Sequence, residues 1–396
     1  MSQTLILPSP KQGAARPKHR IGHSRGLYVL CASIGAERFS FFLLTATLVL
    51  SLNERVGLSS AHSVEMVGYF LCATYLTPLW GGRLCDGRMG CRRVAALGCV
   101  LQTAGYCAFL IGNFAALLCG LILLAIGSGF FKASTQTLMG GLSADGDQQR
   151  ERSFSALYMV INVSALTAPL LAGVLQQHTS WRGNYVVASL GTLLSGVSLA
   201  LWGRWLGNAK PRLRVSTAPP SSAAQQHPHQ QLALILLAGT AFTAGAVQSH
   251  SSLLLWVRDH TERHVGSFET PISWFAAAPA ALVLLLSPLL SLLFGTLRRK
   301  HREPATRHKI LVGLLLSFAA IVPIWAASLL TPHTQKVSAA WALGCLAILS
   351  VSELLVVALA PAEITRIAPM RREGRWLSYW FVAQAVGNMV GGLLHF

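Results

Sequence analysis

Four ionic side chains stand inside stretches that are otherwise apolar enough to cross a membrane. Glu37 and Arg38 lie in SIGAERFSFFLLTATLVL, Lys132 in ALLCGLILLAIGSGFFKASTQTLMGGL and Glu353 in WALGCLAILSVSELLVVALAPAEI. A charge at the centre of a spanning helix costs roughly 2.5–3.5 kcal/mol on insertion scales, so such residues favour a polar interior. This balanced set predicts a cavity for a zwitterion, with the cations on its carboxylate and Glu353 on its ammonium. For Lys132 the alternative is a side chain that reaches the membrane surface.

The two charges of the first stretch share their spacing with bulky apolar residues. Ile34, Glu37, Arg38, Phe41 and Phe42 follow the pattern i, i+3, i+4, i+7 and i+8, which is one face of an α-helix. We therefore expect both charges to point into the cavity and away from lipid. The alternative is a local Glu–Arg pair that neutralises itself inside a bundle.

The composition is that of a membrane protein with many spans. The chain has 396 residues, of which 53% are hydrophobic and 12% are charged, against about 25% charged residues in soluble domains. The eight cysteines form no C-x-x-C pair, so we expect packing cysteines and no metal site. His227 and His229 are expected in a solvated loop. No nucleophile–base pair or phosphate loop is recognisable, so neither an enzyme nor a cofactor is expected.

The distribution of basic residues predicts the topology of an all-α, polytopic membrane protein. Eleven apolar stretches are expected to span the membrane, at about 26–50, 63–82, 93–112, 114–139, 154–176, 184–206, 231–257, 271–297, 308–330, 337–365 and 376–394. Of the 32 lysines and arginines, 25 lie in segments on the same side of the membrane as the N-terminus, and only five lie on the opposite side. This asymmetry places the N-terminus in the cytoplasm. The net charge of +18 then reflects topology and contact with membrane lipids, not nucleic acid.

The spans divide into two groups. We expect a cytoplasmic tail over 1–25, a six-helix bundle over 26–206, a cytoplasmic linker over 207–230 and a five-helix bundle over 231–396. Two bundles joined by a linker are typical of transporters with a substrate site near the midplane. The second group is one span short, which predicts either an outer C-terminus or a truncated product.

Several motifs resemble one family. ERFSFF is similar to part of the E-x-x-E-R-F-x-Y-Y motif of the proton-dependent oligopeptide transporters, a branch of the major facilitator superfamily. YLTPLWGGRLCDGRMGCRR, GSGFFKAS, FSALYMVINVSALTAPLLAG, ETPISWFAAAP, SELLVVALAPAEITRIAP and LSYWFVAQAVGNMVGG resemble other family stretches in the same order. The resemblance covers roughly 26–394 and implies a two-bundle facilitator fold, multi-pass, in a bacterial inner membrane.

The resemblance also implies a site for a di- or tripeptide. Arg38 and Lys132 would lie at the peptide's carboxylate, Glu353 at its amino terminus, and Asn162 and Tyr75 at its backbone. For Asn162 the alternative is an interhelical hydrogen bond, and for Tyr75 a packing ring.

Two further positions of the resemblance, Gln248 and Trp274, are expected at the same site. A cytoplasmic loop would latch the two bundles and control alternating access; its members are Asp86, Arg88, Arg92 and Arg93. The alternative for this loop is a plain cluster of charges.

The chain departs from the family pattern at functional positions. Ile34 replaces the first glutamate of the motif, and Phe41 and Phe42 replace its two tyrosines. Val247 stands where a second glutamate is expected, and Ala276 where a glutamine is expected. Two carboxylates that the family pattern gives to proton coupling are therefore missing.

Proton coupling would then fall on the groups that remain, Glu37, Glu353 and His250. His250 lies one helical turn after Val247, and an imidazole with its ordinary pKa near 6.5 can take up a proton at physiological pH. The alternative is a histidine hydrogen-bonded to a neighbouring helix.

The predicted function is proton-coupled symport of di- or tripeptides, or of related small zwitterions, by alternating access. The apolar replacements keep open a facilitator for another small amphiphile or drug. The missing span and carboxylates keep open a membrane sensor or a decayed relative that does not transport. The sequence leaves the oligomeric state open.

Overall fold

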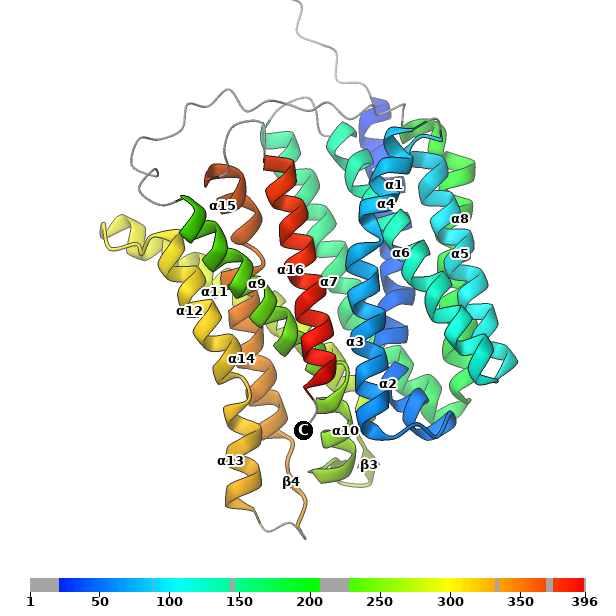
Figure 1. Cartoon of the computed structure of the whole chain (residues 1–396), viewed down its shortest axis with the longest axis vertical. Coiled ribbons are helices and arrows are strands. Elements are labelled where there is room, and N and C mark those ends of the chain that lie inside the picture. The colour runs from blue at the N-terminus through cyan, green and yellow to red at the C-terminus, as the bar shows by residue number, and fades with distance from the viewer. Residues whose placement is uncertain are drawn as a thin grey trace, which may run out of the picture.

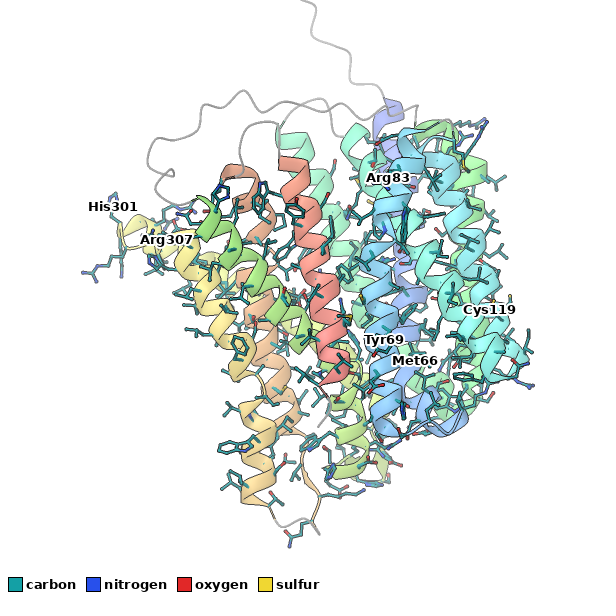
Figure 2. All side chains as sticks on the ribbon, viewed as in Figure 1. Met66, Tyr69, Arg83, Cys119, His301 and Arg307 are labelled. Carbon is teal, nitrogen blue, oxygen red and sulfur yellow. The ribbon has the colours of Figure 1, made fainter. Side chains whose placement is uncertain are left out.

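The computed structural model describes residues 21–87, 89–142, 147–206, 228–331, 335–367 and 373–394. Its long helices run side by side between two ends of the molecule (Figure 1). We call the end at which the first helix begins the basic end, because the labelled residues Arg83 and Arg307 lie toward it (Figure 2). The opposite end, which carries the short strands, is the hairpin end.

The first half of the chain forms eight labelled helices. They are α1 (Ile21–Thr45), α2 (Leu48–Leu50), α3 (Ser60–Leu76), α4 (Pro78–Asp86), α5 (Cys91–Ile111), α6 (Phe114–Leu142), α7 (Asp147–His178) and α8 (Trp181–Trp202). A π-helical turn over Ser51–Arg55 follows α2, and a 3₁₀ turn over Gly203–Leu206 follows α8. α1 already includes residues 21–25, which were expected in the tail, since the helix begins before the apolar run.

The second half contains the remaining helices and four two-residue strands. The helices are α9 (Pro228–Gln248), α10 (Ser252–His260), α11 (Ala278–Arg299), α12 (Thr306–Ala319), α13 (Val322–Leu330), α14 (Ala340–Val356), α15 (Ala360–Ile367) and α16 (Glu373–Leu393). The strands are β1 (Thr261–Glu262), β2 (His264–Val265), β3 (Phe268–Glu269) and β4 (Val337–Ser338), with β1 parallel to β4 and β2 antiparallel to β3. A 3₁₀ segment over Ile272–Ala277 leads into α11. Residues 1–20 of the expected tail and 207–227 of the expected linker lie outside the described residues.

Each of the eleven expected spans is helical, but several consist of two helices in series. Eight helical segments among the described residues are long and apolar enough to cross a membrane, by length and composition. The second expected span breaks into α3 and α4 at Pro78, and the ninth into α12 and α13 before Pro323. A proline lacks the N–H that would continue the ladder and is tolerated in the first helical turn.

The buried apolar core is shared by the two halves at the hairpin end and divided at the basic end. One cluster joins residues of the first half such as Leu50 and Val64 to residues of the second such as Trp256 and Phe275. A second cluster lies wholly in the first half and a third wholly in the second. The halves therefore pack against each other mainly near the hairpin end.

Glycines allow the closest of these contacts. A Cβ added to Gly68 of α3 would stand 2.5 Å from the Cα of Gly392 in α16, so the two halves meet backbone to backbone at this point. Within the first half, α5 and α6 approach in the same way, where a Cβ on Gly98 would stand 2.6 Å from the Gly127 carbonyl oxygen. Small residues let membrane helices come this close, which improves their van der Waals packing.

Substituting Gly68→Ala is expected to lower the thermal unfolding midpoint of the purified protein in detergent. The added methyl group overpacks the α3–α16 contact, at a cost of about 1–3 kcal/mol. Gly295→Ala is the matched control, since its Cβ would enter open space within a helix and alanine favours helices by roughly 0.5–1 kcal/mol. Equal midpoints for the two variants would contradict the close contact.

Candidate functional site

A cavity of about 550 Å³ lies between the two halves and is lined by residues of both. Of the predicted site residues, six line it together: Arg38, Tyr75, Lys132, Asn162, His250 and Glu353. The first half contributes side chains from α1, α3, α6 and α7, and the second half from α9, α11, α14 and α16. Six residues that the sequence singles out on separate helices therefore meet at one cavity.

Arg38 is held by its neighbour in the chain. Its Nε and Nη2 atoms donate hydrogen bonds of 2.6 Å each to the two carboxylate oxygens of Glu37, and Nη2 also donates to Ser128 Oγ at 3.0 Å. Its guanidinium carbon lies 4.7 Å from the centre of the Phe41 ring. Such a bidentate pair fixes both the charge and the direction of the guanidinium.

The structure corrects the expected orientation of Glu37. Arg38, Phe41 and Phe42 line the cavity as predicted, but Glu37 does not, and its side chain is fully buried behind Arg38. Neighbouring positions on a helix differ by about 100°, and the rotation of α1 brings only one of the two charges to the cavity wall. Glu37 therefore acts on the cavity through Arg38.

Lys132 and Glu353 both lack an ionic partner within the ranges that the structure describes. The Lys132 ammonium lies 4.1 Å from the centre of the Tyr75 ring, where the negative face of the ring stabilises the cation. Among the described residues neither Lys132 nor Glu353 forms a salt bridge. Within the described part of the chain, the cavity thus presents an amine on one wall and a carboxyl group on the other, each without an ionic partner.

Asn162 lies on α7 at the cavity wall. Its amide nitrogen donates to the carbonyl oxygen of Tyr158 at 2.9 Å, one turn earlier in the same helix. The hydrogen bond is therefore within the helix and not between helices. Tyr158 itself lines the cavity, so the two side chains form a polar stripe on α7.

Gln248 and Trp274 do not line the cavity. The Gln248 amide nitrogen donates to the carbonyl oxygens of Gly391 at 2.6 Å and Leu394 at 2.8 Å, which ties the end of α9 to the end of α16. The Trp274 indole donates to the Leu170 carbonyl oxygen at 3.0 Å and joins the two halves. Both residues support the walls of the site instead of facing a ligand.

His250 lies in the turn that separates α9 from α10. Its side chain lines the cavity, and its Nδ1 atom is buried without a hydrogen-bond partner in the described part of the chain. The hydrogen bond to a neighbouring helix that was the alternative for this residue is therefore not formed by Nδ1. Val247, which lines the cavity beside it, is almost fully buried.

Hydrogen bonds between the halves close the cavity at the hairpin end. Arg258 donates from Nη1 to Asn53 Oδ1 at 2.7 Å and also pairs with Glu54 at 3.4 Å. Ser273 donates to Gln176 Oε1 at 3.2 Å. Together with the shared apolar core, these contacts separate the cavity from the hairpin end.

The loop predicted to control access is exposed at the basic end. Asp86, Arg92 and Arg93 are exposed, whereas Arg88 lies outside the described residues. Arg92 packs against Gly203 after α8, and none of the three forms an ion pair with a described residue. The latching role of this loop stays a prediction.

Several polar residues of the cavity were not anticipated from the sequence. They are Gln136, Tyr158, Ser249, Ser350, Gln384 and Asn388. The spacing of Gln384 and Asn388, four residues apart in an apolar span, is the signal that indicates a shared polar face. No group of three or more metal-ligating side chains occurs in the described ranges.

Two helical bundles around a charged cavity that is closed at one end define a membrane protein of the transporter class. The chain belongs to the Major Facilitator Superfamily, whose family model matches residues 19–392. The family and the multi-pass helical fold expected from the sequence are thereby confirmed.

Individual relatives carry names from one branch of this superfamily. The chain is 26% identical to the peptide transporter YePEPT of Yersinia enterocolitica subsp. palearctica, over 94% of this chain and 88% of that protein. It is 22% identical to a di-/tripeptide transporter of Lactococcus lactis subsp. cremoris, over 93% and 88% of the two chains. These relatives confirm the resemblance to the oligopeptide transporters.

Solved structures share the fold at lower identity. The crystal structure of a peptide transporter POT in complex with sulfate superimposes with a TM-score of 0.85 at 21% identity, covering 93% of this chain and 87% of that one. A POT family transporter in complex with a thioalcohol-conjugated peptide gives a TM-score of 0.84 at 18% identity, covering 93% and 89%.

Replacing Glu37 by glutamine is expected to destabilise the protein strongly, even though Glu37 does not face the cavity. The substitution leaves Arg38 as an uncompensated buried charge, at a cost on the order of 3–5 kcal/mol. Thermal unfolding in detergent measures the effect, with Glu65→Gln as the control, since Glu65 forms no described ion pair. Rescue of stability in Glu37→Gln/Arg38→Gln is expected, and its absence would contradict the pairing.

Proposed function

We propose that this protein is a secondary active transporter that carries di- or tripeptides, or related small zwitterions, together with protons. The unpaired charges of Lys132 and Glu353 on opposite walls of one cavity carry this proposal. A cavity of about 550 Å³ falls in the range of small-molecule sites, about 300–1,000 Å³. The names of the relatives support the same substrate class.

A bound zwitterion would satisfy both walls at once. Its carboxylate would lie at Lys132 and Arg38 in the first half, and its ammonium at Glu353 in the second half. Each unpaired charge in a closing cavity would otherwise lose water without compensation. The substrate therefore lowers the free-energy cost of bringing the halves together at the basic end, which is the differential interaction that alternating access requires.

The distribution of basic residues supports an orientation with the basic end in the cytoplasm of a bacterial cell, across its inner membrane. The contacts at the hairpin end then make this conformation an inward-facing one. To face outward, the protein would have to break the Arg258–Glu54 and Trp274–Leu170 contacts and close the basic end instead. Gly68 and Gly392 lie within this shared region, where the halves would pivot.

Removing the charge of either Lys132 or Glu353 is expected to reduce uptake of a labelled dipeptide into proteoliposomes that carry an inward proton gradient. Lys132→Gln and Glu353→Gln each remove a charged hydrogen-bond partner worth about 1.5–3 kcal/mol, which corresponds to roughly 10- to 100-fold weaker binding. Lys336→Gln and Glu65→Gln are matched neutral substitutions outside the cavity and are expected to transport normally.

An N-acetylated dipeptide, which lacks the ammonium, is expected to compete poorly with the free dipeptide. Absence of uptake above empty liposomes, with folded protein confirmed, would overturn the proposal. Binding of the dipeptide with an ordinary affinity but without flux would point instead to a sensor.

Proton coupling is proposed to involve His250, with Glu353 and the Glu37–Arg38 pair. The ionic groups that share the cavity with His250 are Arg38, Lys132 and Glu353. Protonated His250 would meet repulsion from the two cations and attraction from Glu353, so its charge biases the balance between the two conformations. This gives the turn between α9 and α10 a direct link to substrate binding.

The variant His250→Asn is expected to flatten the pH dependence of dipeptide uptake. Transport by the parent protein should fall as the pH rises, because the imidazole then loses its proton. Asparagine keeps the size and polarity of the side chain but does not titrate. An unchanged pH profile in the variant would exclude His250 from coupling.

A second candidate function is the transport of a small amphiphile or drug. The cavity walls include Phe41, Phe42, Val247 and Ala276, and apolar walls favour a ligand with a large apolar part. Competition experiments separate the two candidates, because an amphiphile carrier would be inhibited by apolar cations and not by dipeptides.

A further inference from the structure

The helix α11 is far less covered by the rest of the protein than any other long apolar helix described. In the segment Ile272–Arg299, which contains α11, only 11% of the most apolar 18-residue stretch is buried. The corresponding share is 39–50% in the seven other segments of spanning length in the described ranges. Its exposed residues form one face, since Leu285, Leu289, Leu292 and Leu293 follow the spacing i, i+4, i+7 and i+8. Each is 50–67% exposed, so no other described part of the protein covers this face.

The same face of α11 runs into a cluster of basic residues at the basic end. Arg299 stands seven positions after Leu292 and continues the leucine face. Lys300, His301 and Arg302 follow it and are all exposed. Figure 2 shows His301 at the outer tip of this loop, beyond Arg307 and away from the helical bundles.

An ordered turn holds this loop. Arg302 donates its backbone N–H to the Leu297 carbonyl oxygen at 2.9 Å, and His301 to that of Arg298 at 3.0 Å. Glu303 accepts hydrogen bonds of 2.7 Å from both Arg298 Nε and Lys309 Nζ. These hydrogen bonds hold the loop in a defined conformation.

Glu303 is the only acidic residue between positions 270 and 350, and it is already occupied by two cations. The hydrogen bonds from Arg298 and Lys309 lower the pKa of its carboxyl from its ordinary value to about 2. Arg299, Lys300 and Arg302 form no ion pair within the described part of the chain. Three cations thus remain for an external anion.

We propose that the leucine face of α11 and the cations Arg299, Lys300 and Arg302 together bind an anionic phospholipid of the leaflet at the basic end. The phosphate group would lie among the cations, and one acyl chain would lie along the exposed leucines. Arginine and lysine near a membrane surface attract anionic headgroups, and the apolar face directly below them selects a lipid over a soluble phosphate. The proposal does not depend on the cargo of the cavity.

Native mass spectrometry of the protein released from nanodiscs tests this site. The nanodiscs contain phosphatidylethanolamine and phosphatidylglycerol in equal parts, and the retained lipids are counted. The parent protein is expected to retain phosphatidylglycerol in excess over its share of the bilayer. Arg299→Gln/Lys300→Gln is expected to weaken this retention by roughly fivefold per charge, on the order of 25-fold in total.

A matched control removes two exposed arginines from the same end of the first half, in Arg83→Gln/Arg93→Gln. This variant is expected to retain phosphatidylglycerol like the parent protein. Equal loss in both double variants would overturn the proposal in favour of diffuse attraction to the whole basic end. Displacement of the lipid by soluble glycerophosphoglycerol at equal concentration would overturn it as well, because the leucine face would then contribute nothing.

Lipid retention is also expected not to fall as the pH is lowered from about 8 to about 5. The lowered pKa of Glu303 keeps its carboxylate ionised throughout this range, and its stabilising contribution is lost only as the pH falls toward about 2. The turn that presents the cations is thus unchanged. A loss of retention within this pH range, with the protein still folded, would contradict the role given to Glu303.

Discussion

The cost of an unpaired charge inside an apolar bundle is the constraint on which the rest of this structure depends. The chain meets it in two ways. Glu37 and Arg38 neutralise each other within one helix, through a bidentate pair to which the second half of the protein contributes nothing. Among the described residues, Lys132 and Glu353 are left without ionic partners on walls from opposite halves, so they need water, a ligand or a change of conformation. The ion pair fixes the direction of Arg38 at the cavity wall, whereas Lys132 and Glu353 make the cavity responsive to a ligand.

The sequence predicts well that Lys132 and Glu353 line a polar interior, because the physics behind this prediction is local. A lysine or glutamate inside an apolar stretch is visible without any knowledge of the fold, and its cost makes a polar interior the simplest outcome. The positions of the spans follow from hydropathy in the same way, since every expected span is helical. The breaks in these spans at Pro78 and before Pro323 follow from the proline itself.

The predictions that were wrong concern the direction in which a side chain points. Glu37 and Arg38 are neighbours in the chain, and only the packing of α1 against α8, where Gly191 receives Ser40, decides which one meets the cavity. Gln248 is the last residue of α9, and the turn after it directs its amide toward α16. Trp274 lies in a 3₁₀ segment, whose spacing differs from that of an α-helix. In each case tertiary packing or a helix end overrides the helical spacing read from sequence.

The apolar replacement at Ile34 shifts the chemistry of the cavity toward its second half. Ile34 stands one helical turn before Arg38 and lines the same wall as Lys132. An acidic residue there would add a carboxylate to the wall that carries Lys132. With isoleucine in its place, the proposed substrate meets a cation that no side chain has to release. In the proposed mechanism, protonation at the carboxylate end then acts only through the Glu37–Arg38 pair, and at the ammonium end it acts through Glu353 and His250.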